Sequence, residues 1–204
     1  METLTTPANT AQDVIAYYIV SPVSDEAAQL IAEFQASLVD RFSDAIWSVP
    51  RESLHISFNA LSPIYESDRT LDAPSDVPAI YTDAFKAIVS EQKPIKLHFD
   101  TVEAFPAAII LKAQDNGIYK QLRNQFNERV ELPAGTKSTP EIIHTTICKF
   151  HQSVDLDEIK DFLSTKTVEM DMLVDEFRIV REKILYMVDY DILQRFNLSD
   201  TEQV

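Results

Sequence analysis

Glycine is almost absent from this chain of 204 residues, which contains only Gly117 and Gly135. The two are too far apart to form a glycine-rich loop, so the sequence has no G-x-G-x-x-G fingerprint, no P-loop and no G-x-S-x-G nucleophile turn. These absences argue against three common enzyme classes: dinucleotide-binding Rossmann enzymes, P-loop nucleoside triphosphatases and α/β-hydrolases.

Cysteine is limited to Cys148, so no disulfide can form within the chain and no multi-cysteine zinc site can be built. This usage fits a reducing compartment, and we expect the protein to be cytoplasmic. Residues 1–12 lack a basic stretch followed by an apolar one, so we expect no secretory signal there. The longest apolar run, residues 104–111, contains Pro106 and is too short to cross a bilayer, so no membrane association is expected.

Basic residues are scarce, with 18 Lys and Arg against 33 Asp and Glu and a net charge of −15. Proteins that bind long nucleic acid need a basic surface, so we do not expect such a partner. A small phosphorylated ligand in a locally favourable pocket is still compatible with this charge. Residues 112–149 carry six basic and four acidic side chains, so the field around this segment should be less unfavourable for phosphate.

The length and apolar pattern predict a single α+β domain over residues 13–195. A loose N-terminal segment, residues 1–12, should precede it, and a C-terminal tail, residues 196–204, should follow it. Strands are predicted at residues 15–20, 53–61, 95–102, 106–112, 141–150, 168–174 and 184–192, with a further candidate at 177–180. Helices are predicted at residues 25–38, 79–91, 116–130 and 154–163, the first capped by Ser24.

The order strand, helix, strand, helix, strand occurs twice along the chain, which predicts an internal repeat. The central strands of the two halves contain His55 and His144, which are 89 residues apart. The same offset aligns the strand at residues 106–112 with the first strand, and the helix that begins at Asn116 with the first helix. We therefore expect two similar lobes.

Alternate side chains of a strand point to the same face, so His55 shares a face with Ser57, and His144 shares a face with Thr146. The opposite faces carry apolar residues that can pack on a core. If the lobes face each other, the two pairs meet in one cleft. A neutral imidazole can accept a proton, a protonated one can donate it to a leaving oxygen, and the hydroxyls can stabilise charge on phosphate. This set suffices for metal-independent cleavage of a phosphodiester.

The two H-x-[ST] motifs, residues 55–58 (HISF) and residues 144–147 (HTTI), resemble those of the 2H phosphoesterase superfamily. Its members include 2'-5' RNA ligase-like proteins and cyclic nucleotide phosphodiesterases. The resemblance implies two pseudo-symmetric lobes of mainly antiparallel sheet, with outer helices around a central cleft. It also implies a small nucleotide or oligonucleotide substrate that contains a 2',3'-cyclic phosphate or a 2'-5' linkage. No cofactor is expected, and we expect a monomer.

The resemblance assigns the acid and base roles to His55 and His144, and the phosphate contacts to Ser57 and Thr146. Many members have an arginine after the second motif, and Lys149 is the nearest cation in this chain. A lysine can meet phosphate, although without the bidentate geometry of arginine. Strict alternation along the strand places Lys149 on the face opposite His144, which weakens its assignment to the site.

Aromatic side chains near the motif strands are further candidates for substrate contacts, because a base can stack on them. The candidates are Tyr17, Tyr18, Trp47, Phe58 and Phe150, and Trp47 is expected in a polar loop before the first motif. Packing in the core is the competing interpretation for each of them.

Three alternatives to a two-histidine enzyme use the same residues. A metal site could draw on His144, Cys148, His151 and His98, but their spacing matches no metal motif. A binding module could hold a nucleotide or phosphate in the same cleft without turnover. An interaction domain could carry the two histidine motifs by coincidence.

Overall fold

The protein, as seen in a computed structural model, is described over residues 3–66 and 72–198. The four α-helices of these residues are α1 (Asp25–Phe42), α2 (Ala79–Val89), α3 (Ile118–Asn127) and α4 (Leu156–Ser164). The strands are β1 (Asp13–Pro22), β2 (Ile46–Ser48), β3 (His55–Ala60), β4 (Tyr65–Glu66), β5 (Ile95–Phe105), β6 (Ala108–Gln114), β7 (Ile143–Phe150), β8 (Met170–Val174), β9 (Glu176–Ile184) and β10 (Asp189–Asn197).

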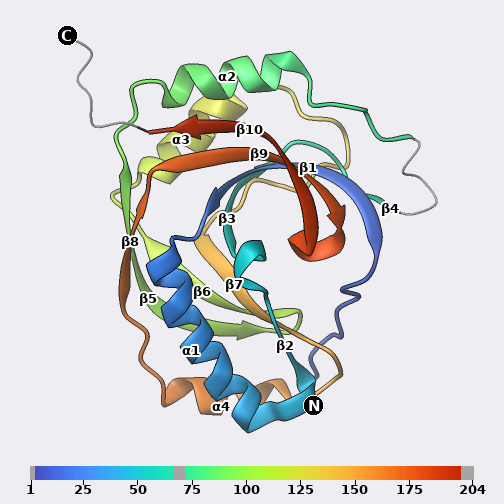
Figure 1. Ribbon diagram of the computed structural model, residues 1–204, viewed down its shortest axis with the longest axis vertical. Helices are drawn as coiled ribbons and strands as arrows, with labels where there is room; N and C mark the ends of the chain where they lie inside the picture. The colour runs from blue at the N-terminus through green and yellow to red at the C-terminus, as the bar shows by residue number, and fades with distance from the viewer. Residues whose placement is uncertain (1–2, 67–71, 199–204) are drawn as a thin grey trace.

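The strands form one curled antiparallel sheet in the order β10-β9-β1-β3-β7-β6-β5-β8, with β2 paired to β7 and β4 paired to β1. In Figure 1, α2 and α3 lie together at one end of this sheet, and α1 and α4 lie at the other. The α+β class and the mainly antiparallel sheet predicted from the sequence are confirmed.

The predicted repeat is visible in the chain order. In the first half β1, α1 and β3 follow one another, and in the second half β6, α3 and β7 do the same. The motif strands β3 and β7 are neighbours at the centre of the sheet, joined in register through Ile56 and Thr145. The two lobes are therefore continuous through one short ladder rather than two separate sheets.

Local capping explains where the helices begin. The Ser24 hydroxyl accepts a hydrogen bond from the Ala27 amide at the start of α1, and the Asp155 carboxylate accepts one from the Asp157 amide at the start of α4. Before α3, the Asp115 carboxylate accepts bonds from the amides of Gly117 and Tyr119. The cap predicted at Ser24 is confirmed.

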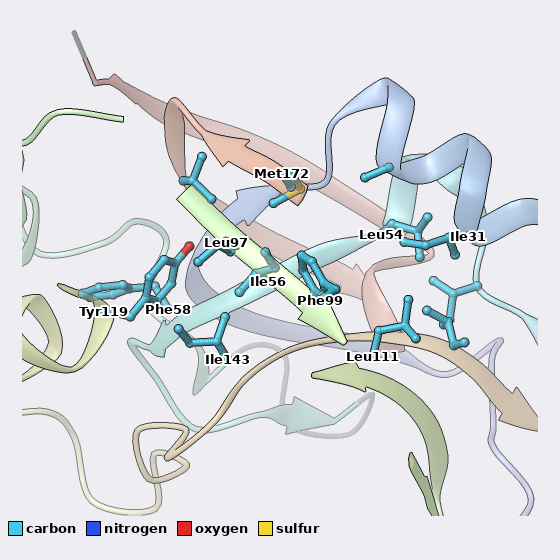
Figure 2. Packing of buried hydrophobic residues seen from close by; sticks show 14 of the residues in the cluster. Ile31, Leu54, Ile56, Phe58, Leu97, Phe99, Leu111, Tyr119, Ile143 and Met172 are labelled. Atoms are coloured by element: carbon cyan, nitrogen blue, oxygen red, sulfur yellow. The ribbon is translucent and has the colours of Figure 1, made fainter. Parts of the chain in front are cut away.

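The core lies behind the motif strands. Ile56 and Phe58 are fully buried, and Figure 2 shows them packed among residues of other strands and of α3. The ring of Phe58 has its centroid 5.1 Å from that of Phe85 and 5.4 Å from that of Phe177, in edge-to-face geometry. Because these contacts hold the apolar face of β3, the opposite face, with His55, is firmly oriented.

Three segments differ from the sequence prediction. Within the expected loose segment, the amides of Thr5 and Ala8 donate hydrogen bonds to the carbonyls of Val154 and Phe150. At the expected C-terminal tail, Phe196 and Leu198 are buried, whereas residues 199–204 lie outside the described residues. The strand predicted at residues 184–192 is interrupted, because residues 189–192 belong to β10 but residues 185–187 do not form a strand.

Residues 185–187 form a 3₁₀ turn between β9 and β10 instead of continuing a strand. Tyr186 and Met187 have φ angles of 68° and 58°, in the left-handed region. The turn contains no glycine, asparagine or proline, so its sequence carries no turn signal. Its apolar residues therefore resemble a strand. Within the described residues, no helix is both long and apolar enough to cross a membrane.

Candidate active site

The two histidine motifs lie side by side on neighbouring strands. Ile56 of β3 pairs with Thr145 of β7 in an antiparallel ladder, and both of these side chains are fully buried. Antiparallel register then places His55 across from Thr146 and Ser57 across from His144 on the other face. Each histidine therefore lies across the ladder from the hydroxyl residue of the other motif.

Both motif strands contain a β-bulge at the equivalent position. The pairing of β3 with β1 skips Phe58, and the pairing of β7 with β6 skips Ile147. Ile147 lies 89 residues after Phe58, the same offset that separates the two histidines. An extra residue in one strand changes which face the following side chains occupy. In β7 the bulge returns Lys149 to the side of Thr146, where it lines the candidate site. Strict alternation, which placed Lys149 on the opposite face, was therefore wrong.

The two histidines are held in the same way. The Nδ1 atom of His55 lies 2.8 Å from the carbonyl oxygen of Ser53, two residues earlier, and the carbonyl of Ile142 bonds His144 in the same relationship. A carbonyl only accepts, so a neutral His55 must carry its proton on Nδ1, which leaves Nε2 as an acceptor.

Burial, together with nearby charges, lowers the pKa values of both histidines. Burial lowers the pKa of His55, and the nearby charges of His144 and Lys149 lower it further, while the Ser53 carbonyl opposes them. Burial also lowers the pKa of His144, and the Arg123 charge adds to this effect against the opposing Ile142 carbonyl. Both rings thus favour the neutral form more than a free histidine does.

A cavity of about 150 Å³ lies over this face of the sheet. Five of the side chains predicted from the sequence line it, namely His55, Ser57, Thr146, Lys149 and Tyr18. His144 does not line this cavity. It lies at its border, placed there by the β3–β7 register and close enough for its charge to affect His55.

Four of the five aromatic candidates do not reach the cavity. Tyr17, Phe58 and Phe150 are fully buried in the core, so their prediction as substrate contacts was wrong. Trp47 lies not in a loop but in β2, where it pairs with Lys149 and packs partly buried against the core. The three-residue strand β2 is too short to produce a recognisable sequence pattern.

The cavity also contains residues that the sequence did not single out. Lys137 comes from the loop before β7, and Glu182, Tyr186 and Met187 come from β9 and the turn after it. The Nζ atom of Lys149 lies 3.9 Å from the centre of the Tyr186 ring, in a cation–π contact. The sequence held no signal for Glu182, because it lies between Arg181 and Lys183 in a strand with several charged residues.

Burial, together with the charge of Lys137, lowers the pKa of Lys149 to about 8, and the charge of Glu182 acts in the opposite direction. Lys149 therefore carries a positive charge at neutral pH, next to the hydroxyl of Thr146. A dehydrated ammonium group in such a cavity attracts an anion more strongly than an exposed lysine does.

Arg123 of α3 lies directly behind the site and is 4% exposed. Its Nε and one terminal nitrogen donate hydrogen bonds to the carbonyls of Phe58 and Ser57, at 3.0 and 2.8 Å. These carbonyls lie at the β3 bulge, where the regular ladder is interrupted. Arg123 thus fixes the backbone that carries Ser57.

The four candidate metal donors are not gathered. His98 is bonded to Asp171 on the surface, and Cys148 is buried, which raises the pKa of its thiol to about 12. Over the described residues, no group of three or more His, Cys, Asp or Glu side chains is arranged to hold a metal ion.

The structure is similar to several solved structures at low sequence identity. TT0787 of Thermus thermophilus has a TM-score of 0.65 and 16% identity, over 90% of this chain and 97% of that chain. E. coli LigT in complex with phosphate has a TM-score of 0.63 and 15% identity, over 92% of this chain and 99% of that chain. The MHV ns2 PDE domain has a TM-score of 0.51 and 13% identity, over 87% of this chain and 97% of that chain. Their shared fold is the one that the resemblance of the two motifs to the 2H phosphoesterase superfamily implies.

The chain has the 2H phosphoesterase fold. No protein-family model and no curated protein sequence matches it. Identities of 13–16% relate these structures through their fold, so activity must be inferred from the side chains of this chain. In this chain the 2H phosphoesterase fold places both motifs on adjacent central strands.

Proposed function

We propose that this protein is a metal-independent phosphodiesterase that uses His55 and His144 as a proton-accepting and proton-donating pair. The observation that carries this proposal is the β3–β7 register, which sets each histidine across from the hydroxyl of the other motif. Lys149 adds a positive charge to the same cavity. General acid–base catalysis typically contributes about 10²–10⁴ to a rate, and stabilisation of the phosphate charge adds to it.

In the proposed reaction, a neutral histidine removes a proton from the attacking water or ribose hydroxyl as its oxygen bonds to phosphorus. The bond from phosphorus to the leaving oxygen breaks, and the second histidine, in its protonated form, donates its proton to that oxygen. Ser57, Thr146 and Lys149 stabilise the non-bridging phosphate oxygens. The two histidines end in exchanged protonation states, and solvent restores them.

The proposed substrate is a small nucleotide or oligonucleotide with a 2',3'-cyclic phosphate or a 2'-5' linkage. The net charge of −15 disfavours long RNA. A second cavity of about 350 Å³ shares Ser53, His55 and Met187 with the first and offers space for the rest of a nucleotide. Solved LigT structures contain phosphate, 3'-AMP, ATP and NADP+, which are small phosphorylated ligands.

Turnover of a substrate panel in the presence of a chelator tests this function. The panel contains 2',3'-cyclic nucleotides, 2'-5' dinucleotides and cyclic dinucleotides, and the control variant is His98→Ala, which changes a surface histidine bonded to Asp171. We expect cleavage of at least one class by the wild type and by His98→Ala. Binding of these compounds without any cleavage would instead identify a nucleotide-binding module.

A further inference from the structure

Among the described residues, Glu182 is the one acidic side chain in the wall of the 150 Å³ cavity, and it is 3% exposed. Its Oε1 accepts a hydrogen bond from the Met187 amide at 2.8 Å, which holds the left-handed turn after β9. Its Oε2 is buried and has no hydrogen-bond partner of ordinary geometry within residues 3–66 and 72–198. The structural role of Glu182 therefore accounts for one oxygen only.

The neighbours of Glu182 leave the second oxygen without a hydrogen bond of ordinary geometry. The Tyr18 phenol reaches the carboxyl as a donor of poor geometry, and burial together with the Glu182 charge raises the pKa of this phenol. Lys137 and Lys149 affect its charge electrostatically, yet neither forms an ion pair with it in the described part of the chain. A buried acceptor without a partner is costly, so such a group in a native protein calls for an explanation.

The chemistry of the missing partner is restricted. Non-bridging phosphate oxygens are acceptors, so they cannot satisfy a carboxylate, and the partner must be an O–H or N–H donor. The cavity is smaller than the roughly 300–1,000 Å³ of typical ligand pockets, so it accommodates the phosphate and only the atoms next to it. In a 2'-5' linked substrate, and in the 2'- or 3'-phosphate product of a cyclic one, the donor next to the phosphate is the adjacent ribose hydroxyl.

We propose that Oε2 of Glu182 accepts a hydrogen bond from the ribose hydroxyl adjacent to the bound phosphate, so that Glu182 selects ribonucleotides over deoxyribonucleotides. This proposal rests on the proposed function. A site built to pair with a hydroxyl rejects the analogue that lacks it, because the buried group is then left without a partner. The nucleobase would extend past His55 into the neighbouring cavity.

The test compares calorimetric binding of adenosine 3'-monophosphate and 2'-deoxyadenosine 3'-monophosphate. We expect the wild type to prefer the ribonucleotide by about 10- to 100-fold, the range that one unsatisfied buried acceptor can produce. Glu182→Gln can still accept the Met187 amide bond, but it can present an amide in place of Oε2, so the preference should fall to about threefold or less. Glu91→Gln, which removes the same charge at an exposed position beyond α2, should keep the wild-type preference.

A wild-type preference near one would overturn the proposal, and so would an equal weakening of both nucleotides in Glu182→Gln. The second result would mean that the carboxyl is protonated and donates to the phosphate, or that it only supports the turn. If Glu182→Gln lacks the wild-type unfolding transition, Glu182→Asp replaces it, and it should weaken the ribonucleotide more than it weakens inorganic phosphate.

Inorganic phosphate separates this proposal from the proposed function. If the wild type binds phosphate and both nucleotides without preference, only the role of Glu182 fails. If it binds neither phosphate nor nucleotide, both proposals fail.

Discussion

Ile56 of β3 pairs with Thr145 of β7, and this pair joins the two halves of the sheet directly beneath the candidate site. Its side chains point into the core, so the next residue on each strand points into the site. The Oγ1 atom of Thr145 is buried without a hydrogen-bond partner in the part of the chain that the structure describes. Two adjacent threonines of β7 thus have opposite surroundings: Thr145 in the core and Thr146 in the cavity.

This contrast predicts opposite outcomes for two isosteric substitutions. Thr145→Val removes an unsatisfied buried hydroxyl and should raise the free energy of unfolding by about 1 kcal/mol without reducing turnover. Thr146→Val should change stability little and lower kcat by about 10- to 1,000-fold, because a hydrogen bond to the charged phosphate is lost. Denaturant unfolding and initial rates on the same preparations measure both effects. Equal loss of activity in the two variants would contradict the assignment of the faces.

Arg123 is expected to set part of the pH dependence. The pKa values of both histidines are lowered from 6.5, so kcat/KM should be bell-shaped with its optimum below pH 6.5. Removing the Arg123 charge in Arg123→Met should raise the pKa of His144 and move one limb of the profile to higher pH. Arg123→Lys keeps the charge and should keep the profile.

Other charged groups near His144 should contribute less than Arg123 to the pH dependence of kcat/KM. Lys112 of β6 lies across from His144 in the ladder, but it is paired with Glu103 at 3.1 Å. Both Arg123 variants should lose stability, since the carbonyls of Ser57 and Phe58 lose donors. If Arg123→Met and Arg123→Lys shift the profile equally, the arginine acts only as a support.

Lys149 predicts a loss of phosphate affinity in mild alkali. Its pKa of about 8 means that it is charged below that pH and neutral above it, so phosphate binding should weaken as the pH rises from about 7.5 to about 9.5. Lys149→Arg stays charged throughout this range and should retain its affinity. Calorimetric titration with inorganic phosphate measures the difference, with Lys120→Arg on the exposed surface of α3 as control. Parallel curves for wild type and Lys149→Arg would exclude Lys149 from the site.

The sequence was sufficient to predict the elements whose patterns are local. As far as the bulge in each motif strand, the alternation predicted which side chains face the core, and Ser24 predicted the start of α1. The repeat of 89 residues placed His55 and His144 in equivalent strands. These features depend on spacing along the chain, which the sequence displays directly.

The features that the sequence did not predict depend on contacts between distant segments. The bulges at Phe58 and Ile147 arise from pairing with β1 and β6, and only the second bulge brings Lys149 into the site. Glu182 and Tyr186 reach the cavity because β9 pairs with β1 and then turns through a left-handed segment. No short-range pattern encodes either arrangement.

The most direct test of the two-histidine mechanism is a double-mutant cycle on kcat for the substrate identified by the panel. His55→Ala and His144→Ala should each lower kcat by about 10²–10⁴ while the variants retain the wild-type unfolding transition. Groups that act as one unit are strongly non-additive, so the double variant should be about as active as the weaker single variant. Losses that simply multiply, or a single variant with wild-type turnover, would contradict an acid–base pair.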